Sequence, residues 1–310
     1  MTSPAKTQWG FAVPQVFLDG PVDMELVRKV ATRAEAKGYH SLWVLEQTTR
    51  EFANLEPVAL LCYVAAITSR PRLGSSVILS PFRNPMLFAK ELESLDQMSG
   101  GRLILGIGLG NAGRDYPAFG IPVKGRVRRF LEGVELLKAS WTQPSVTHKG
   151  EFWQPEGFLM GPKPLQKPHP PIWFGGRHPN QLRRAVRHAD GWMGSGGTSS
   201  TAEFKQQVQL LRQYLDEAGR DPSTFAISKR VYFFADRNKA QARRVLDHWF
   251  TRVYPAYPRG QEVAVWGTVN ECTQQLAEVI AAGAQLIAVT PVASDLEMLD
   301  LVTEEIIPSL

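Results

Sequence analysis

The chain has 310 residues, of which 44% are hydrophobic, and it carries a formal net charge of +5 with a pI of about 9.2. This composition is typical of a globular protein and excludes a disordered or fibrous chain. No apolar run approaches the ~20 residues of a membrane helix, and residues 1–6 lack the apolar core of a signal peptide. Cys62 and Cys272 each lie in a helical apolar pattern, so we expect no disulfide framework. From these observations together we expect no membrane contact and a cytoplasmic location.

Runs rich in β-forming residues alternate with amphipathic helical patterns along the whole chain. Eight runs are expected as strands: residues 10–17, 41–45, 72–80, 103–108, 171–174, 191–193, 225–235 and 285–290. Helices are expected after the N-cap Asp23, over 57–68, around 88–95, 130–141, 246–253 and 272–280, and after Ser294. A proline-rich excursion, residues 143–171, interrupts the alternation, and we expect a small hairpin around residues 148–150 within it.

Eight strand-and-helix units in a chain of this length predict an α/β fold, a single (β/α)8 TIM-type barrel over residues 1–310. The excursion is an insertion between strands 4 and 5, and helical additions are expected near the C-terminus. An open doubly wound sheet is the alternative.

Residues 108–113 read GLGNAG and match the G-x-G-x-x-G dinucleotide fingerprint. That fingerprint requires glycines that open a helix directly, after the first strand of a βαβ unit. Here they follow the fourth expected strand, and the prolines and glycine of residues 114–122 predict a loop. We therefore expect no Rossmann site, but a barrel mouth where backbone approaches a flat ring, with a ligand-free turn as the alternative.

The sequence lacks the motifs of several kinds of catalytic and binding site. It contains no Walker loop, no H-E-x-x-H, no paired cysteines, no G-x-S-x-G, and six scattered histidines, so we expect no metal site. The arginine clusters at 126–129 and 183–187 fall on helical patterns, which favours solvated helix faces over a nucleic-acid interface. A barrel mouth without a nucleophile or metal indicates that a cofactor carries the chemistry. Two small-residue loops, 175–178 and 195–200, open onto helices and predict a phosphate site.

Five stretches carry a family resemblance: Gly38–Gln47, Leu95–Arg102, Gly106–Gly110, Lys163–Gly176 and Ala189–Trp192. Together they resemble the bacterial luciferase-like family of flavin- and deazaflavin-dependent oxidoreductases. The resemblance implies a TIM-type barrel that binds FMN or the deazaflavin coenzyme F-420 at its C-terminal mouth, and a non-prolyl cis peptide at Ser76–Val77. The positions that the resemblance assigns to cofactor binding are Glu46, Ser76, Val77, Gly110, Asn111, Gly175, Gly176, Arg177 and His178.

Two departures from the family bear on mechanism. Deazaflavin alcohol or sugar dehydrogenases of the family place a histidine where Gln47 stands and a glutamate where Asn111 stands. Neither residue here titrates near neutrality, so both are expected to act only by hydrogen bonding. This disfavours alcohol oxidation and favours ene or imine reduction, or oxygen activation at a reduced flavin.

Three functions stay open from the sequence. Deazaflavin-dependent hydride transfer to or from a small organic substrate is favoured by the Ser76–Val77 match and the compact loops. The alternative is an FMN-dependent two-component monooxygenase, which takes reduced flavin from a separate reductase. A cofactor-free binding protein on the same barrel is the third. The expected assembly is a homodimer.

Overall fold

The computed structural model describes residues 6–47, 50–113, 115–255 and 259–310. Its centre is a closed barrel of parallel strands in which each strand pairs with its neighbours in chain order, and β10 pairs with both β9 and β11. The barrel strands are β1 (Gln8–Ala12), β3 (Ser41–Val44), β5 (Arg72–Ser75), β6 (Leu103–Ile107), β9 (Ile172–Gly175), β10 (Gly191–Gly194), β11 (Ala226–Ala235) and β13 (Leu286–Pro291). The predicted (β/α)8 barrel is confirmed.

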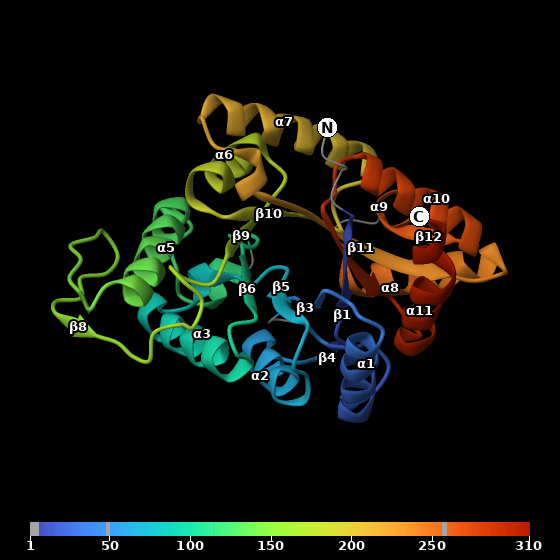
Figure 1. The fold of residues 1–310 in the computed structure, drawn as a ribbon, viewed down its shortest axis with the longest axis horizontal. Helices are drawn as coiled ribbons and strands as arrows, with labels where there is room; N and C mark the ends of the chain where they lie inside the picture. Colours follow the sequence, from blue (N-terminus) through green and yellow to red (C-terminus); the bar gives the residue numbers. More distant parts are fainter. Residues whose placement is uncertain (1–5, 48–49, 114, 256–258) are drawn as a thin grey trace.

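Helices surround this barrel on all sides in Figure 1. They are α1 (Met24–Ala36), α2 (Pro57–Ile67), α3 (Pro85–Ser99), α5 (Arg126–Thr142), α6 (Pro179–His188), α7 (Thr201–Glu217), α8 (Lys239–Val253), α10 (Val269–Ala281) and α11 (Asp295–Leu301). Smaller elements are α4 (Asp115–Ala118), α9 (Gly260–Val263), the 3-10 turns 80–82, 222–224 and 307–309, a π-helical turn over 302–306, and β12 (Val265–Gly267), which extends the sheet from β11. Among the described residues, no helix has the length and apolar character needed to cross a bilayer.

Two strands end earlier than the sequence predicts. The expected run 10–17 divides, because β1 stops at Ala12 and the two-residue β2 (Val16–Phe17) pairs antiparallel with β4 (Ala53–Asn54). The expected run 72–80 stops at Ser75, and the Ser76–Val77 peptide bond shortly after it is cis as predicted.

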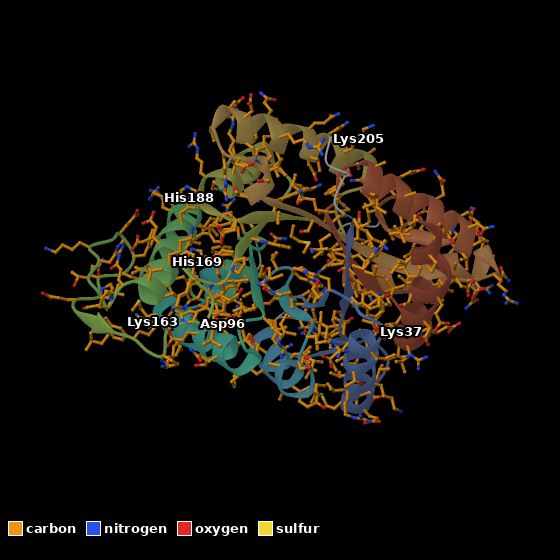
Figure 2. The ribbon with its side chains drawn as sticks, viewed as in Figure 1. Lys37, Asp96, Lys163, His169, His188 and Lys205 are labelled. Carbon is orange, nitrogen blue, oxygen red and sulfur yellow. The ribbon has the colours of Figure 1, made fainter. Side chains whose placement is uncertain are left out.

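The insertion between β6 and β9 lies on the outside of α3 and α5 (Figures 1 and 2). Its hairpin, β7 (Ser145–Val146) and β8 (Phe158–Leu159), encloses residues 147–157, a longer loop than the turn expected around 148–150. Lys163 donates from Nζ to the Ser140 and Gln143 carbonyl oxygens at 2.6 and 2.7 Å, and Gln166 donates to Asp96 of α3 at 2.7 Å.

Aromatic side chains fill the barrel at the N-terminal end of its strands and close that end. The Trp43 and Trp173 rings lie 5.5 Å apart, with Ile104, Met193 and Leu286 in the same buried cluster. A Cβ atom at Gly10 or Gly74 would come within 2.4 Å of the Trp43 ring, so only glycine admits this side chain. The open end of the barrel is therefore the C-terminal end of the strands.

Candidate active site

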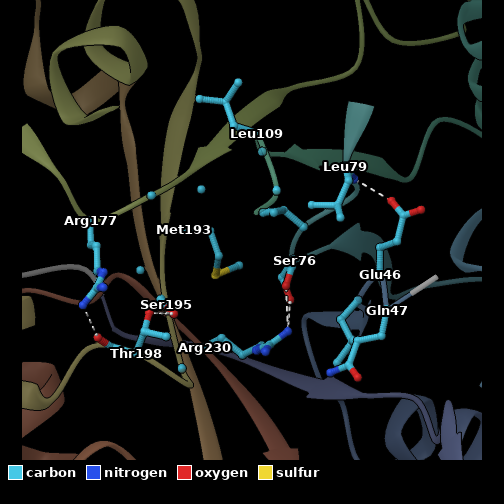
Figure 3. A pocket seen from close by; sticks show the side chains of 18 of the residues that line it. Glu46, Gln47, Ser76, Leu79, Leu109, Arg177, Met193, Ser195, Thr198 and Arg230 are labelled. Carbon is cyan, nitrogen blue, oxygen red and sulfur yellow. Dashed lines mark hydrogen bonds between the residues drawn. The ribbon is translucent and has the colours of Figure 1, made fainter. Parts of the chain in front are cut away.

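A cavity of about 360 Å³ lies at the C-terminal ends of the barrel strands (Figure 3). This volume is within the range of ~300–1,000 Å³ that is typical of small-molecule sites. Its walls come from the segments that follow β3, β5, β6, β9 and β10, together with Arg230 of β11 and Tyr254. Segments far apart in the chain meet here because parallel barrel strands present all their carboxyl ends at one mouth.

Most residues that the sequence assigned to the site line this one cavity. They are Glu46, Gln47, Ser76, Val77, Gly110, Gly175, Gly176 and Arg177. Asn111 and His178 do not line it: Asn111 is exposed and accepts a hydrogen bond from the Gly113 N–H at 3.0 Å, and His178 caps the N-terminus of α6. The glycine stretch does not open a helix directly, since α4 begins at Asp115; Arg114, between them, lies outside the described residues.

The glycines on one wall make room for Val77. A Cβ atom at Gly108 would lie 2.8 Å from Val77 Cγ2, and one at Gly175 would lie 3.0 Å from Val77 Cγ1. At Gly106 it would lie 1.8 Å from the Ser75 carbonyl oxygen. Gly106 thus allows the close approach of β5, and Gly108 and Gly175 leave space for the Val77 side chain, which lines the cavity.

Glu46 is held by its own ion pair. Its carboxylate accepts from Arg83 Nη1 at 2.9 and 2.8 Å and from the Leu79 N–H at 2.5 Å, and its side chain is only 3% exposed. Arg83 also reaches Glu56 at 2.9 Å. The carboxylate therefore fixes the segment around Leu79 against β3, and its charge is balanced within the protein.

Gln47 is buried beside the same wall. Its backbone carbonyl accepts from Asn54 Nδ2 at 2.7 Å, whereas no described group hydrogen-bonds its side-chain Oε1. A buried amide oxygen without a partner costs free energy, so the position favours a ligand that donates to it.

Arg230 is a site residue that the sequence analysis missed. Its guanidinium donates to the Ser76 carbonyl oxygen at 2.7 Å, to the Tyr254 hydroxyl at 3.2 Å and to the Tyr232 hydroxyl, and Figure 3 shows it pointing toward Ser76. The two tyrosine hydroxyls are themselves 2.8 Å apart. The sequence feature that could have indicated it is a pair of basic residues, Lys229 and Arg230, inside a mostly apolar strand.

Lys229 points to the other side of β11 and anchors the loop after β10. Its Nζ donates to the Ser195 and Ser199 carbonyl oxygens, both at 2.6 Å, and lies 5.3 Å from the Phe204 ring of α7. Burial lowers the pKa of Lys229 to about 7, against the opposing influence of Glu203. The loop 195–200 is therefore tied to the barrel from behind.

The two loops that the sequence predicts as phosphate sites differ in how many of their backbone N–H groups already have an acceptor. In the loop 175–178, the N–H groups of Arg177 and His178 both donate to Gln181 Oε1 at 2.9 Å. In the loop 195–200, the Ser195 and Thr198 hydroxyls bond each other at 2.8 Å, and no described group accepts from the N–H of Gly196, Gly197 or Thr198. Arg177 joins the loops by donating to the Thr198 carbonyl at 3.3 Å (Figure 3). Three N–H groups of the second loop thus have no described acceptor, against one, that of Gly176, in the first.

Comparison with known proteins finds a matching family model and similar sequences. The family model described as luciferase-like monooxygenase matches residues 11–263. An F420-dependent glucose-6-phosphate dehydrogenase of Kineococcus radiotolerans is 30% identical over 227 residues, 71% of this chain and 66% of the relative. An FMNH2-dependent dimethylsulfone monooxygenase of Pseudomonas putida is 28% identical over 244 residues, 77% of this chain and 66% of the relative.

Solved structures share the fold at lower sequence identity. An F420-dependent secondary alcohol dehydrogenase superposes with a TM-score of 0.84 at 20% identity, covering 98% of this chain and 99% of that one. The oxygenating constituent of 3,6-diketocamphane monooxygenase from Pseudomonas putida, in complex with FMN, gives 0.78 at 19% identity, with 98% and 99% covered.

Proposed function

The chain belongs to the luciferase-like monooxygenase family, and from this membership we propose that it is an oxidoreductase that uses the deazaflavin coenzyme F-420. The observation that carries the proposal is the charge of the cavity. Arg50, Arg177 and Arg230 line it, while Glu46, the one carboxylate among its described lining residues, is paired with Arg83. A cavity with this balance suits an anionic, phosphate-bearing cofactor, a description that F-420 and FMN share. The 30% identical relative whose name states F420 dependence favours F-420.

The residues present fit such a cofactor. The loop 195–200 supplies backbone N–H groups and hydroxyls suited to a phosphate, with the Arg177 guanidinium beside them. Val77 and the glycines beside it, Gly108 and Gly175, would form the surface on which a flat ring rests, together with Gly110. When bound and reduced, the deazaflavin supplies a hydride.

The chain's own residues limit which substrate accepts that hydride. The Gln47 amide lies in the wall of the cavity and holds a polar atom without moving a proton. No histidine lines the cavity among the described residues, so the general base that alcohol oxidation needs is not supplied by that residue type. We propose reduction of a conjugated C=C or C=N bond in a small molecule.

The FMN monooxygenase is the second candidate, favoured by the 28% identical relative whose name states FMNH2 dependence. It would require a separate flavin reductase as a partner. For either cofactor we propose a homodimer.

Anaerobic titration of the purified protein with F-420, oxidised FMN and reduced FMN tests the proposal. We expect saturable binding of F-420, seen as a shift of its absorbance band, and affinity for FMN at least about tenfold weaker, since ~1.4 kcal/mol of lost contacts gives that factor. Tighter binding of reduced FMN would replace the proposal by the monooxygenase. No binding of any of the three would leave a cofactor-free binding protein.

A further inference from the structure

A second, inner cavity of about 60 Å³ adjoins the main one. The two share Leu45, Ser76 and Arg230 as lining residues. The inner cavity is also lined by the segment 12–16 after β1, by Trp249 of α8, by Thr290 at the end of β13 and by Asp295 at the start of α11. Its volume corresponds to a small polar group or a few waters, each of which takes ~30 Å³ in the liquid.

Arg230 brings a buried positive charge to this cavity. It is 6% exposed, and its guanidinium donates to uncharged acceptors: the Ser76 carbonyl oxygen and the hydroxyls of Tyr232 and Tyr254. No carboxylate of the described residues pairs with it, and its buried Nε has no hydrogen-bond partner among them. A buried guanidinium with a free N–H is stabilised by an electron-rich atom placed against it.

Thr290 contributes a second unpaired polar atom. It lies opposite Tyr232 in the register of β13 and β11, and it is 6% exposed. Its hydroxyl oxygen is buried, and no described group hydrogen-bonds it. Two residues on neighbouring strands, each with an unpaired buried polar atom, therefore line one small cavity, next to the site where the cofactor is proposed to bind.

We propose that the inner cavity is the substrate subsite for an uncharged carbonyl oxygen, which accepts hydrogen bonds from Arg230 Nε and the Thr290 hydroxyl. This assignment rests on the proposed function, which places the reacting part of the substrate in the adjoining cavity. The oxygen of a ketone, aldehyde or enone provides two lone pairs for the two donors and fits the volume.

The Asp295 carboxyl group determines which ligand charge the inner cavity accepts. Its carboxyl lines the same cavity, and burial raises its pKa to about 6, so it is ionised at neutral pH. One cation and one anion at the wall leave no net charge to be compensated by the ligand. A carboxylate would be repelled by Asp295, whereas a neutral carbonyl would not.

The test uses cyclohex-2-enone as a neutral probe and acetate as an anionic one. Both are titrated into the cofactor-free protein by calorimetry at pH 7.5, so that the result does not depend on whether any cofactor binds. Wild type is expected to bind the enone saturably and more tightly than acetate. Thr290→Val keeps the shape and removes the hydroxyl, and should weaken enone binding by about five- to tenfold, the loss of one hydrogen bond.

Thr68→Val is the matched control, because the Thr68 hydroxyl is also buried but donates to the Val64 carbonyl at 2.7 Å and accepts from Arg102 at 3.1 Å. It should melt at a lower temperature and bind the enone as wild type does. Thr290→Val should melt at the wild-type temperature or above it, because it removes an unpaired polar group. The proposal is overturned if Thr290→Val binds the enone normally, if it loses stability as Thr68→Val does, or if acetate binds more tightly than the enone.

Discussion

The loops after β9 and β10 look alike in sequence and differ in the structure. Both are short runs of small residues that open onto a helix, 175–178 before α6 and 195–200 before α7. In the first, the Gln181 side chain folds back and accepts from two N–H groups. In the second, three N–H groups have no described acceptor, and Lys229 holds the loop from behind. Composition therefore predicts that a loop can bind an anion, but the neighbouring side chains decide whether its donors are free.

The difference indicates where a phosphate would be bound. Gln181 already satisfies the first turn of α6, so an anion there would have to displace a formed capping box. The loop 195–200 also ends in a capping box, in which the Ser200 N–H donates to Glu203, but no described group accepts from the N–H of Gly196, Gly197 or Thr198 before it. We expect it to provide most of the phosphate affinity, with Arg177 adding a charge from the first loop. Three variants test this comparison.

Lys229→Met should have the largest effect. Methionine has a similar length but leaves the Ser195 and Ser199 carbonyl oxygens without their donor. Unpaired buried carbonyls cost ~1–3 kcal/mol each, so the loop should move and F-420 affinity should fall about a hundredfold, as measured by absorbance titration. An unchanged dissociation constant in the folded variant would assign the phosphate to another loop.

The same variant has a pH signature. The pKa of Lys229 is about 7 in the folded protein and ~10.4 in an unfolded chain, so between these values the unfolded state binds more protons. Stability of wild type should therefore rise with pH from about 7 to 10 relative to Lys229→Met. Denaturant unfolding at several pH values measures the difference, and parallel curves for the two proteins would contradict it.

Arg177→Ala should have an intermediate effect. Its guanidinium is exposed and bridges the two loops, so we expect F-420 binding about tenfold weaker at low salt and a smaller difference at high salt. Arg183→Ala is the matched control, because Arg183 of α6 stacks on the Tyr214 ring at 4.5 Å and does not line the cavity. Equal losses in the two variants would show a general charge effect instead of a contact.

Gln181→Ala should have the smallest effect on binding. It frees the N–H groups of Arg177 and His178 and breaks the capping box, which should cost ~1 kcal/mol of stability in thermal unfolding. Cofactor affinity should stay within about twofold of wild type. A tenfold gain would reverse the comparison, since it would mean that the first loop binds the phosphate once its donors are released.

Repeating local patterns in the sequence predict the positions of the barrel strands. Apolar periodicity and turn residues located all eight barrel strands, because each pattern reflects burial of one face of one element. The ends were less accurate: β5 stops at Ser75, although the Ser76 N–H still donates to the Val44 carbonyl and the Ile78 N–H to the Gly106 carbonyl. The family resemblance indicated Glu46, Ser76, Val77 and several glycines of the cavity lining, which lie together because parallel strands open at a common mouth.

The sequence by itself thus determined the order of the elements, the barrel and the family. Only the tertiary structure decided that Gly108 and Gly175 make room for Val77, that Gln181 occupies the first loop, and that Arg230 and Thr290 share one cavity. The physical reason is that periodicity is set by neighbours a few residues apart along the chain. The partner of a hydrogen bond or a buried charge is set by barrel register, which brings residues from distant strands together.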